Sequence, residues 1–195
     1  AYDNAKEFFD TGITWSNSLN VAQMLEKSSY SISLGNTHQD GIISSTGMDR
    51  YNVKVSADTK LTNNWSSGFT ANYITTSIDK AVTSGNGLLR TVYAAPPSYD
   101  LAGIPSHVDG NQYTQNSFRG SFDNAYWAMD NNKFTEDTNR FFGNVYASYQ
   151  TDFGTTNHKL NAKYMVGVDA YTTHYVDSYG YGSNTGCLLY TSPSP

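Results

Sequence analysis

Residues 51–61 alternate strictly between apolar and polar side chains. One face carries Tyr51, Val53, Val55, Ala57, Thr59 and Leu61, and the other carries Asn52, Lys54, Ser56, Asp58 and Lys60. A period of two residues is typical of a β-strand whose two faces meet different surroundings. The stretch is also about as long as the roughly 9–11 residues that a tilted strand needs to cross the hydrocarbon of a bilayer. The pattern predicts a strand with one apolar face and one polar, charged face.

The same alternation recurs along the chain. It predicts strands at about residues 14–25, 28–39, 49–62, 65–78, 138–153 and 158–175. Because short turn sequences separate several of these strands from their successors, consecutive strands are expected to pair as hairpins. We therefore expect an all-β chain, folded as an antiparallel up-and-down meander of about six strands.

The expected connections alternate between short and long. The short ones are residues 26–27, 63–64 and 154–157, and the long ones are residues 40–47, 79–137 and whatever follows Tyr175. In a meander, this alternation puts all the short turns at one edge of the sheet. Outer-membrane β-barrels sort their connections in this way, with tight periplasmic turns and longer extracellular loops. A soluble β-sandwich has no reason to do so.

Residues 79–137 form the longest expected connection. They are rich in Gly, Asn, Asp, Ser and aromatic residues, and we expect a largely irregular loop. Within it, residues 87–95 favour one or two helical turns, which Pro96 and Pro97 would end. Connections of this length are commonly functional or disordered.

Aromatic side chains lie near both ends of the expected strands. Trp65, Tyr30 and Phe153 are near the short turns, and Trp15, Tyr51, Tyr73 and Phe141 are near the long connections. Trp65 and Tyr73 would be separated by roughly 20 Å after strand tilt, close to the height of the apolar band between the aromatic girdles of a membrane barrel. The alternative is that aromatic residues simply favour strands.

Composition narrows the classes of function. The chain has 195 residues, of which 38% are hydrophobic, and a net charge of −5. This charge, without a basic stripe, argues against nucleic acid as a partner. Cys187 is the only cysteine, which excludes an internal disulfide and a thiolate metal site. The sequence opens at Ala1 without a signal peptide, and we expect that peptide to lie upstream if the parent protein is exported.

The titratable residues do not form a catalytic or metal-binding pattern. The four histidines are scattered, with no pair at metal-ligand spacing. Residues 130–134 begin like a calcium loop, but Phe134 occupies a ligand position and no glycine follows. The carboxylates of the long connection have the pattern of a solvated loop. We therefore predict no enzyme activity, no metal and no cofactor.

Several short motifs, in order, resemble the SusC/RagA-type TonB-dependent outer-membrane proteins. In the first half they are Asp10-Thr11-Gly12, Asn17-Ser18-Leu19-Asn20-Val21, Ser29-Tyr30-Ser31-Ile32-Ser33, Gln39-Asp40-Gly41-Ile42 and Arg50-Tyr51-Asn52. In the second half they are Asn124-Ala125-Tyr126-Trp127, Asp137-Thr138-Asn139-Arg140 and Gly143-Asn144, which look like the segment that re-enters the barrel in that family. The resemblance covers most of residues 7–182.

The resemblance implies a barrel of about 22 strands with an N-terminal plug, in the outer membrane of a Gram-negative, Bacteroidetes-like bacterium. Members import glycans or peptides, take energy from the TonB complex and work with a SusD-like surface lipoprotein. Residues 1–186 would then be a partial, multi-pass barrel in contact with outer-membrane lipid. The plug, the TonB-contacting segment and the closing strands would lie outside this chain.

Residues 187–195 depart from the family pattern abruptly after Gly186. We interpret them as a non-native tail, with the appearance of translated sequencing adapter. The alternative is a genuine extracellular loop that has been cut short.

Loop aromatics are the candidate ligand or partner contacts, because rings stack on sugars while Asn and Asp side chains bond their hydroxyls. Tyr126 and Trp127 are the best candidates, since they match the family motif just before re-entry, and Tyr93 and Tyr113 are further candidates. For each of them the alternative is packing of the loop onto itself and the barrel rim. For the whole chain the alternative is a soluble carbohydrate-binding or adhesin-like β domain, which would bury its apolar strand faces against a second sheet.

Overall fold

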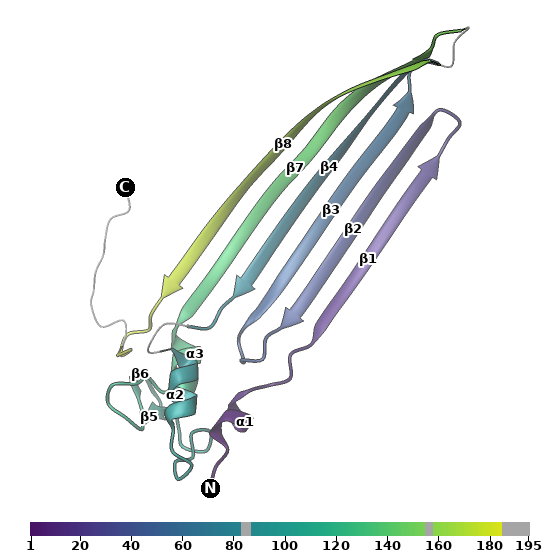
Figure 1. Ribbon diagram of the computed structural model, residues 1–195. Coiled ribbons are helices and arrows are strands. Elements are labelled where there is room, and N and C mark those ends of the chain that lie inside the picture. The colour runs from purple at the N-terminus through teal and green to yellow at the C-terminus, as the bar shows by residue number, and fades with distance from the viewer. Residues whose placement is uncertain (83–86, 155–157, 185–195) are drawn as a thin grey trace, which may run out of the picture.

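The computed structural model describes residues 1–82, 87–154 and 158–184 and contains one large antiparallel sheet (Figure 1). Its strands are β1 (Thr14–Met24), β2 (Ser28–Asp40), β3 (Gly47–Lys60), β4 (Trp65–Asp79), β7 (Lys133–Asp152) and β8 (Lys159–Ser178). They lie in the order β1-β2-β3-β4-β7-β8, and every neighbouring pair is antiparallel. The expected six-strand meander is therefore confirmed.

Both strands of the last hairpin are longer than the sequence pattern predicts. β7 begins at Lys133 instead of about residue 138, and β8 ends at Ser178 instead of about residue 175. The sequence from Lys133 is charged and looks like a loop, but its backbone pairs with the end of β8, where Lys133 faces Ser178. Cross-strand pairing thus outweighs local composition here.

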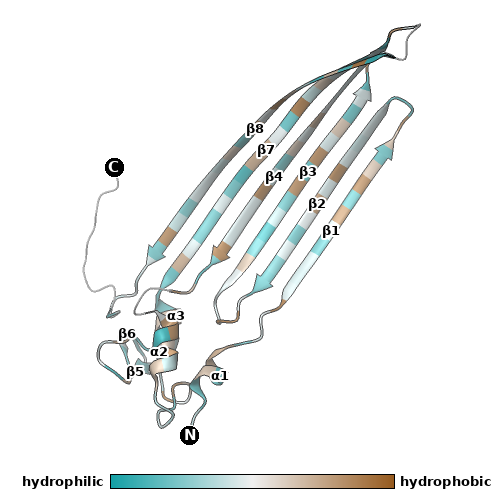
Figure 2. Ribbon diagram, viewed as in Figure 1, coloured by the Kyte–Doolittle hydropathy of each residue, from teal (hydrophilic) through white to brown (hydrophobic). Residues whose placement is uncertain are grey.

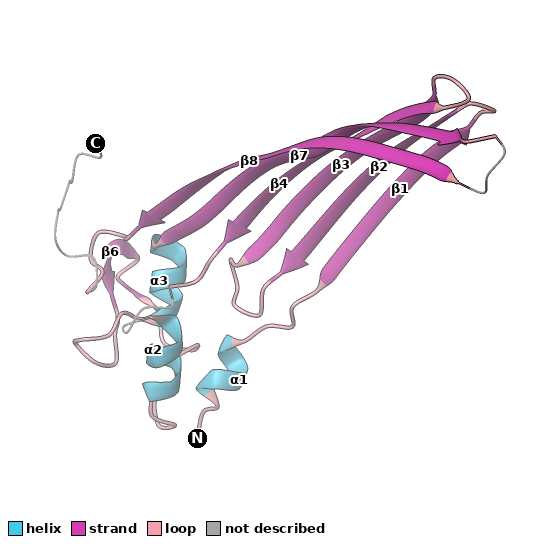
Figure 3. Ribbon diagram, turned by 45° about the horizontal axis from the view of Figure 1, so that its top comes forward, coloured by secondary structure: helices cyan, strands magenta, loops and turns pink. Residues whose placement is uncertain are grey.

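The connections are sorted between the two ends of the sheet. Residues 25–27 and 61–64 join strands at one end, and residues 41–46 and 80–132 join strands at the other (Figure 3). This agrees with the alternation expected from the sequence. The third short turn, at residues 154–157, lies largely outside the described residues.

One face of the sheet is apolar in three successive rows that run across all six strands. The rows are Leu19-Leu34-Val53-Tyr73-Phe141-Ala170, then Val21-Ile32-Val55-Ala71-Gly143-Val168, then Gln23-Tyr30-Ala57-Phe69-Val145-Val166. The register therefore aligns the apolar positions of separate strands into one band, and Figure 2 shows the matching alternation of hydropathy along each strand. Apart from half-buried Val55, the large apolar side chains in these rows are 40–59% exposed.

The connection 80–132 is not the irregular loop that the sequence suggested. It holds α2 (Leu88–Ala94), β5 (His107–Val108), β6 (Asn111–Gln115) and α3 (Ala125–Asn131), and it packs with α1 (Asn4–Phe8) at one end of the sheet (Figure 1). The predicted helical turns at residues 87–95 are confirmed as α2. We call residues 1–10 together with residues 88–132 the cap. No helix among the described residues is long and apolar enough to cross a membrane.

The cap has a hydrophobic core of its own. Its buried apolar side chains are Phe8, Leu88, Val92, Leu101, Ala125, Trp127 and Ala128. These come from α1, α2, α3 and the chain between them, so none of the helices could bury its apolar side chains alone. The core residues are spread over more than a hundred positions of sequence, which explains why local patterns did not reveal it.

Two buried asparagines hold the cap segments together. The Asn4 side chain donates to the Tyr99 carbonyl oxygen at 3.0 Å and accepts from the Leu101 N–H at 3.0 Å. Asn124 caps the N-terminus of α3, where its Oδ1 accepts from the Tyr126 N–H at 3.0 Å. Because each amide satisfies backbone groups that would otherwise be unpaired, both residues can be buried without a large penalty.

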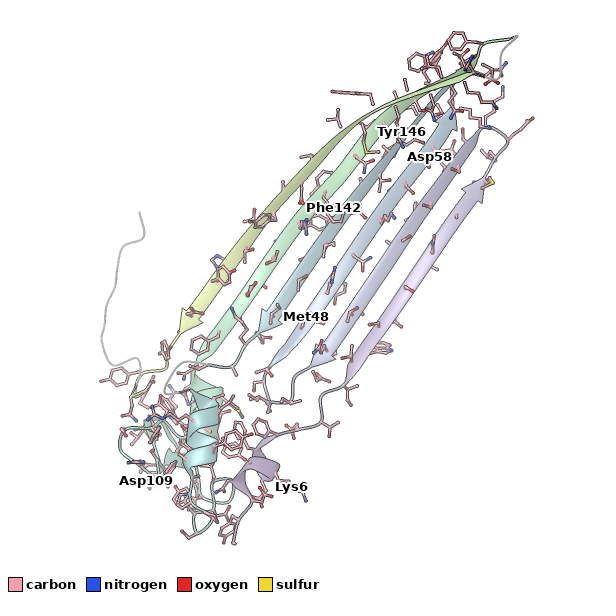
Figure 4. The ribbon with its side chains drawn as sticks, in the orientation of Figure 1. Lys6, Met48, Asp58, Asp109, Phe142 and Tyr146 are labelled. Carbon is pink, nitrogen blue, oxygen red and sulfur yellow. The ribbon has the colours of Figure 1, made fainter. Side chains whose placement is uncertain are left out.

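Gly68 in β4 allows a side chain of β7 to reach a side chain of β3. The Tyr146 hydroxyl crosses β4 and donates to the Asp58 carboxylate at 2.5 Å, and Figure 4 shows the two residues toward the same end of the sheet, on the strands that flank β4. A Cβ on Gly68 would lie 2.7 Å from the Tyr146 ring and 2.9 Å from the Ala57 carbonyl oxygen. The missing side chain of Gly68 is therefore the space that Tyr146 occupies.

We predict that Gly68→Ala lowers the free energy of unfolding by about 1–3 kcal/mol, because the Tyr146 ring must move away from Asp58. Urea unfolding of the chain in detergent micelles, followed by gel mobility, measures this. Gly120→Ala is the matched control, since a Cβ at Gly120 meets no atom within 4 Å. Equal unfolding midpoints for the two variants would contradict the packing role of Gly68.

Candidate ligand-contacting surface of the cap

Tyr93 and Tyr126 belong to one aromatic cluster at the N-terminal side of the cap. The Tyr126 ring meets Phe8 edge-on at 5.4 Å between centroids, Phe8 meets Phe9 at 5.4 Å, and Phe9 meets Tyr93 at 6.2 Å. Tyr93 is 69% exposed, whereas Tyr126 is half-buried. The structure therefore brings these two predicted residues together through Phe8, the last residue of α1, and Phe9, which follows it.

The surroundings of Tyr126 favour its neutral form. Burial raises the pKa of the Tyr126 phenol above its ordinary value, and the carboxylates of Glu7, Asp10 and Asp100 raise that pKa further. Tyr126 is thus a neutral hydroxyl that can donate and accept hydrogen bonds at physiological pH. This suits contact with an uncharged polar ligand at the partly open side of the cluster.

Trp127 is not at the surface, contrary to the role predicted for it. Its side chain is 0% exposed and lies in the cap core, and its indole N–H donates to the Gln112 carbonyl oxygen at 2.9 Å. The sequence pattern identified an important aromatic residue but could not distinguish a buried ring from an exposed one. Trp127 therefore holds β6 through its hydrogen bond to Gln112 and cannot stack on a ligand.

Tyr113 forms a second aromatic site with a residue that the sequence analysis missed. The Tyr113 ring, on β6, meets the Tyr181 ring edge-on at 5.7 Å between centroids. The two side chains are 53% and 78% exposed. Tyr181 follows β8 and lies outside the long connection 79–137, so only the return of the chain to the cap in space reveals the pair.

A buried carboxylate attaches the segment after β8 to the cap. Asp123 is buried, and it accepts hydrogen bonds from the Gln115 side chain at 2.7 Å, the Ser183 hydroxyl at 2.6 Å and the Asn184 N–H at 2.6 Å. The same Gln115 amide nitrogen donates to the Gly182 carbonyl oxygen at 2.8 Å. These contacts fix residues 182–184 against β6.

A cleft of about 390 Å³ lies where the cap meets the sheet. Thr46, Lys80, Leu88, Met129, Asn132 and Phe134 are among its lining residues. Lys80 is held there by an ion pair with Glu136, with 3.1 Å between Nζ and Oε2, and by the Tyr175 ring at 5.0 Å. The cationic group is thus already occupied by protein partners.

The polar face of the sheet carries charged groups that neutralise one another. Arg140 on β7 pairs with Asp169 on β8, with 2.9 Å between Nε and Oδ1. Near the short-turn end, the Lys163 ammonium lies over the Tyr146 ring at 4.0 Å from its centroid, beside the Tyr146–Asp58 hydrogen bond. Such exposed pairs contribute little stability, but they make this face hydrophilic along its length.

The described residues contain no group of three His, Cys, Asp or Glu side chains that could hold a metal ion. Residues 130–134, which begin like a calcium loop in sequence, divide between the end of α3 and the start of β7. Comparison with family models and with curated proteins finds no match to this chain.

Proposed function

We propose that the chain is part of the wall of a transmembrane β-barrel. The observation that carries the proposal is the band of three apolar rows, which crosses all six strands and exposes nearly all of its large side chains. Soluble proteins rarely expose a continuous apolar patch of more than a few hundred Å². Lipid tails would cover this band, and the opposite polar face would meet water or a plug inside the barrel.

The ends of the band support the same proposal. On the apolar face, Trp65 and Tyr149 form a ring pair with centroids 5.0 Å apart near the short turns. Toward the long connections, the row of Tyr51 on the same face is followed by a row that contains the His38–Asp49 pair, with 2.7 Å between Nδ1 and Oδ1. Aromatic residues at the boundaries, followed by charged residues, are typical of the interfaces of membrane barrels.

The particular protein that fits best is an importer of the SusC/RagA type. The motifs that resemble this family lie in the strands, the cap and the re-entry into β7, and the short and long connections are sorted as in outer-membrane proteins. In this proposal the cap is extracellular and meets the glycan or peptide substrate or a SusD-like surface lipoprotein. Energy would come from the TonB complex through a part of the protein outside this chain.

A soluble carbohydrate-binding or adhesin-like domain is the second candidate. Its support is the exposed tyrosines of the cap, which would suit sugar binding in either protein. Such a domain would bury the apolar rows against a second layer, and the described residues place no second sheet there. The membrane proposal is therefore favoured.

Site-directed labelling tests the proposal directly. The chain with Cys187→Ser is folded into lipid vesicles, and a fluorophore is attached to Val145→Cys or to Asn144→Cys, which are neighbours on opposite faces of β7. We expect a lipid-soluble quencher to act on position 145 and a water-soluble quencher on position 144. Quenching of both positions by the aqueous reagent alone would overturn the membrane assignment.

A further inference from the structure

Tyr113 of the cap and Tyr181, which follows β8, form an exposed pair beside a cap that buries three of its aromatic rings. Phe8, Phe122 and Trp127 are buried, whereas Tyr113 and Tyr181 are more than half exposed while their rings remain in edge contact. A single exposed aromatic residue is ordinary. Tyr113 and Tyr181 come from distant parts of the chain and meet at the surface. Burial in the core does not explain their placement, because both rings stay exposed, and this points to a role in binding.

The two backbone segments that carry Tyr113 and Tyr181 are held against each other. Gly182, next to Tyr181, has a φ of +102°, and a Cβ there would collide with the Tyr113 carbonyl oxygen. Gln115 joins the two segments, because its side-chain nitrogen donates both to Asp123 and to the Gly182 carbonyl oxygen. Trp127 contacts both segments: its indole N–H donates a hydrogen bond to the Gln112 carbonyl oxygen, and its ring lies 3.5 Å from the position of a Cβ on Gly182. The pair is therefore pre-organised, which lowers the entropy cost of binding.

The side chains of β6, which carries Tyr113, are uncharged. β6 consists of Asn111, Gln112, Tyr113, Thr114 and Gln115, and the first four of these are exposed. Amide and hydroxyl side chains both donate and accept hydrogen bonds, which matches the hydroxyl groups of a sugar. The faces of tyrosine rings offer apolar contact area with a polar edge, which matches the C–H face of a pyranose. The charged terminus of a peptide would instead favour a side chain of opposite charge on β6.

We propose that Tyr113 and Tyr181 form a carbohydrate-binding site that takes a pyranose unit of a neutral oligosaccharide. The rings provide the stacking surface, the exposed side chains of β6 bond the hydroxyls, and Trp127, Gln115 and Asp123 position the two tyrosines without touching the sugar. This inference rests on the proposed importer function and narrows its substrates from glycans or peptides to glycans.

The test is titration calorimetry on the full chain in detergent micelles. The probes are neutral hexasaccharides of glucose, xylose and mannose, with uncharged hexapeptides as the competing class. We expect at least one hexasaccharide to bind, and Tyr113→Ala and Tyr181→Ala each to weaken that binding about tenfold. Tyr113→Phe keeps the ring and should retain affinity within about threefold. Tyr2→Ala removes another exposed tyrosine of the cap, one with no proposed ligand role, and should change nothing.

Three results would overturn the site. They are no binding of any hexasaccharide, equal weakening by Tyr2→Ala and Tyr113→Ala, and tighter binding of the hexapeptides with the same dependence on Tyr113. Circular dichroism and proteolysis of each variant show that the cap is still folded. The quencher experiment on positions 144 and 145 does not involve these tyrosines, so failure of the sugar site and failure of the membrane proposal give different patterns of results.

Discussion

Replacing Val145 by arginine should lower the stability of the membrane-inserted sheet by about 2–4 kcal/mol, because the charge is then forced into the middle of the hydrocarbon. Val145 lies in the third of the three apolar rows, between Phe69 on β4 and Val166 on β8. Aromatic residues lie beyond it toward both strand ends, so we place it near the bilayer midplane. Urea unfolding from lipid vesicles, followed by the band shift of folded and unfolded protein on a gel, measures the loss.

Asn144→Arg is the matched control for Val145→Arg. Asn144 is adjacent in β7 and points to the opposite, polar face, where Arg140 and Lys163 already show that long cationic side chains are accommodated. We expect it to change the free energy of unfolding by less than about 0.5 kcal/mol. If the two substitutions were equally harmful, the assignment of the two faces would be wrong, whatever the value of the loss.

Strand faces could be predicted from the sequence because the signal that sets them is local. The period of two along residues 51–61 already separates Val53 and Val55 from Lys54 and Ser56, and no distant contact is needed to read it. Register follows for the same reason, since a slip by one residue would move every apolar side chain to the polar face. The structure pairs Val55 with Ile32 and Ala71, which keeps the apolar positions in line.

The cap could not be predicted in the same way, because long-range contacts define it. Phe8 and Trp127 are far apart in sequence but share one core, and Asn4 bonds the backbone at Tyr99 and Leu101. Composition alone therefore described residues 79–137 as a loop. The helical turns of α2 were predictable, since a proline stop signal follows them directly.

The candidate site was predicted only in part. Tyr93, Tyr113 and Tyr126 lie at or near the surface, but Tyr113 has Tyr181 as its neighbour, and this partner is 68 positions later in the sequence. Trp127 was predicted to contact the ligand because neither the motif nor the composition shows whether a side chain is buried or exposed. The sequence did carry one signal of burial. Asn124 is a typical N-cap, so Trp127 falls in the first turn of a helix, and its neighbour Ala128 is a small residue typical of a packed helix face.

Trp127→Ala should therefore act on the cap rather than on the ligand directly. The side chain is fully buried, and truncation of a buried tryptophan costs about 3–5 kcal/mol through lost contacts and the cavity left behind. The substitution also removes the indole hydrogen bond to the Gln112 carbonyl oxygen and the ring that lies against Gly182. We expect the cap to open at lower denaturant concentration while the six-strand sheet keeps its pairing.

Hydrogen exchange measured by mass spectrometry separates these two effects. Peptides from α3 and β6 should lose most of their protection in Trp127→Ala, and peptides from β3 and β4, which pair with other strands along both edges, should keep theirs. Tyr93→Ala is the control, since its exposed ring can be removed with little loss of packing. Unchanged protection of α3 and β6 in Trp127→Ala would show that the indole does not support the cap, and the orientation of Tyr113 against Tyr181 would then need another cause.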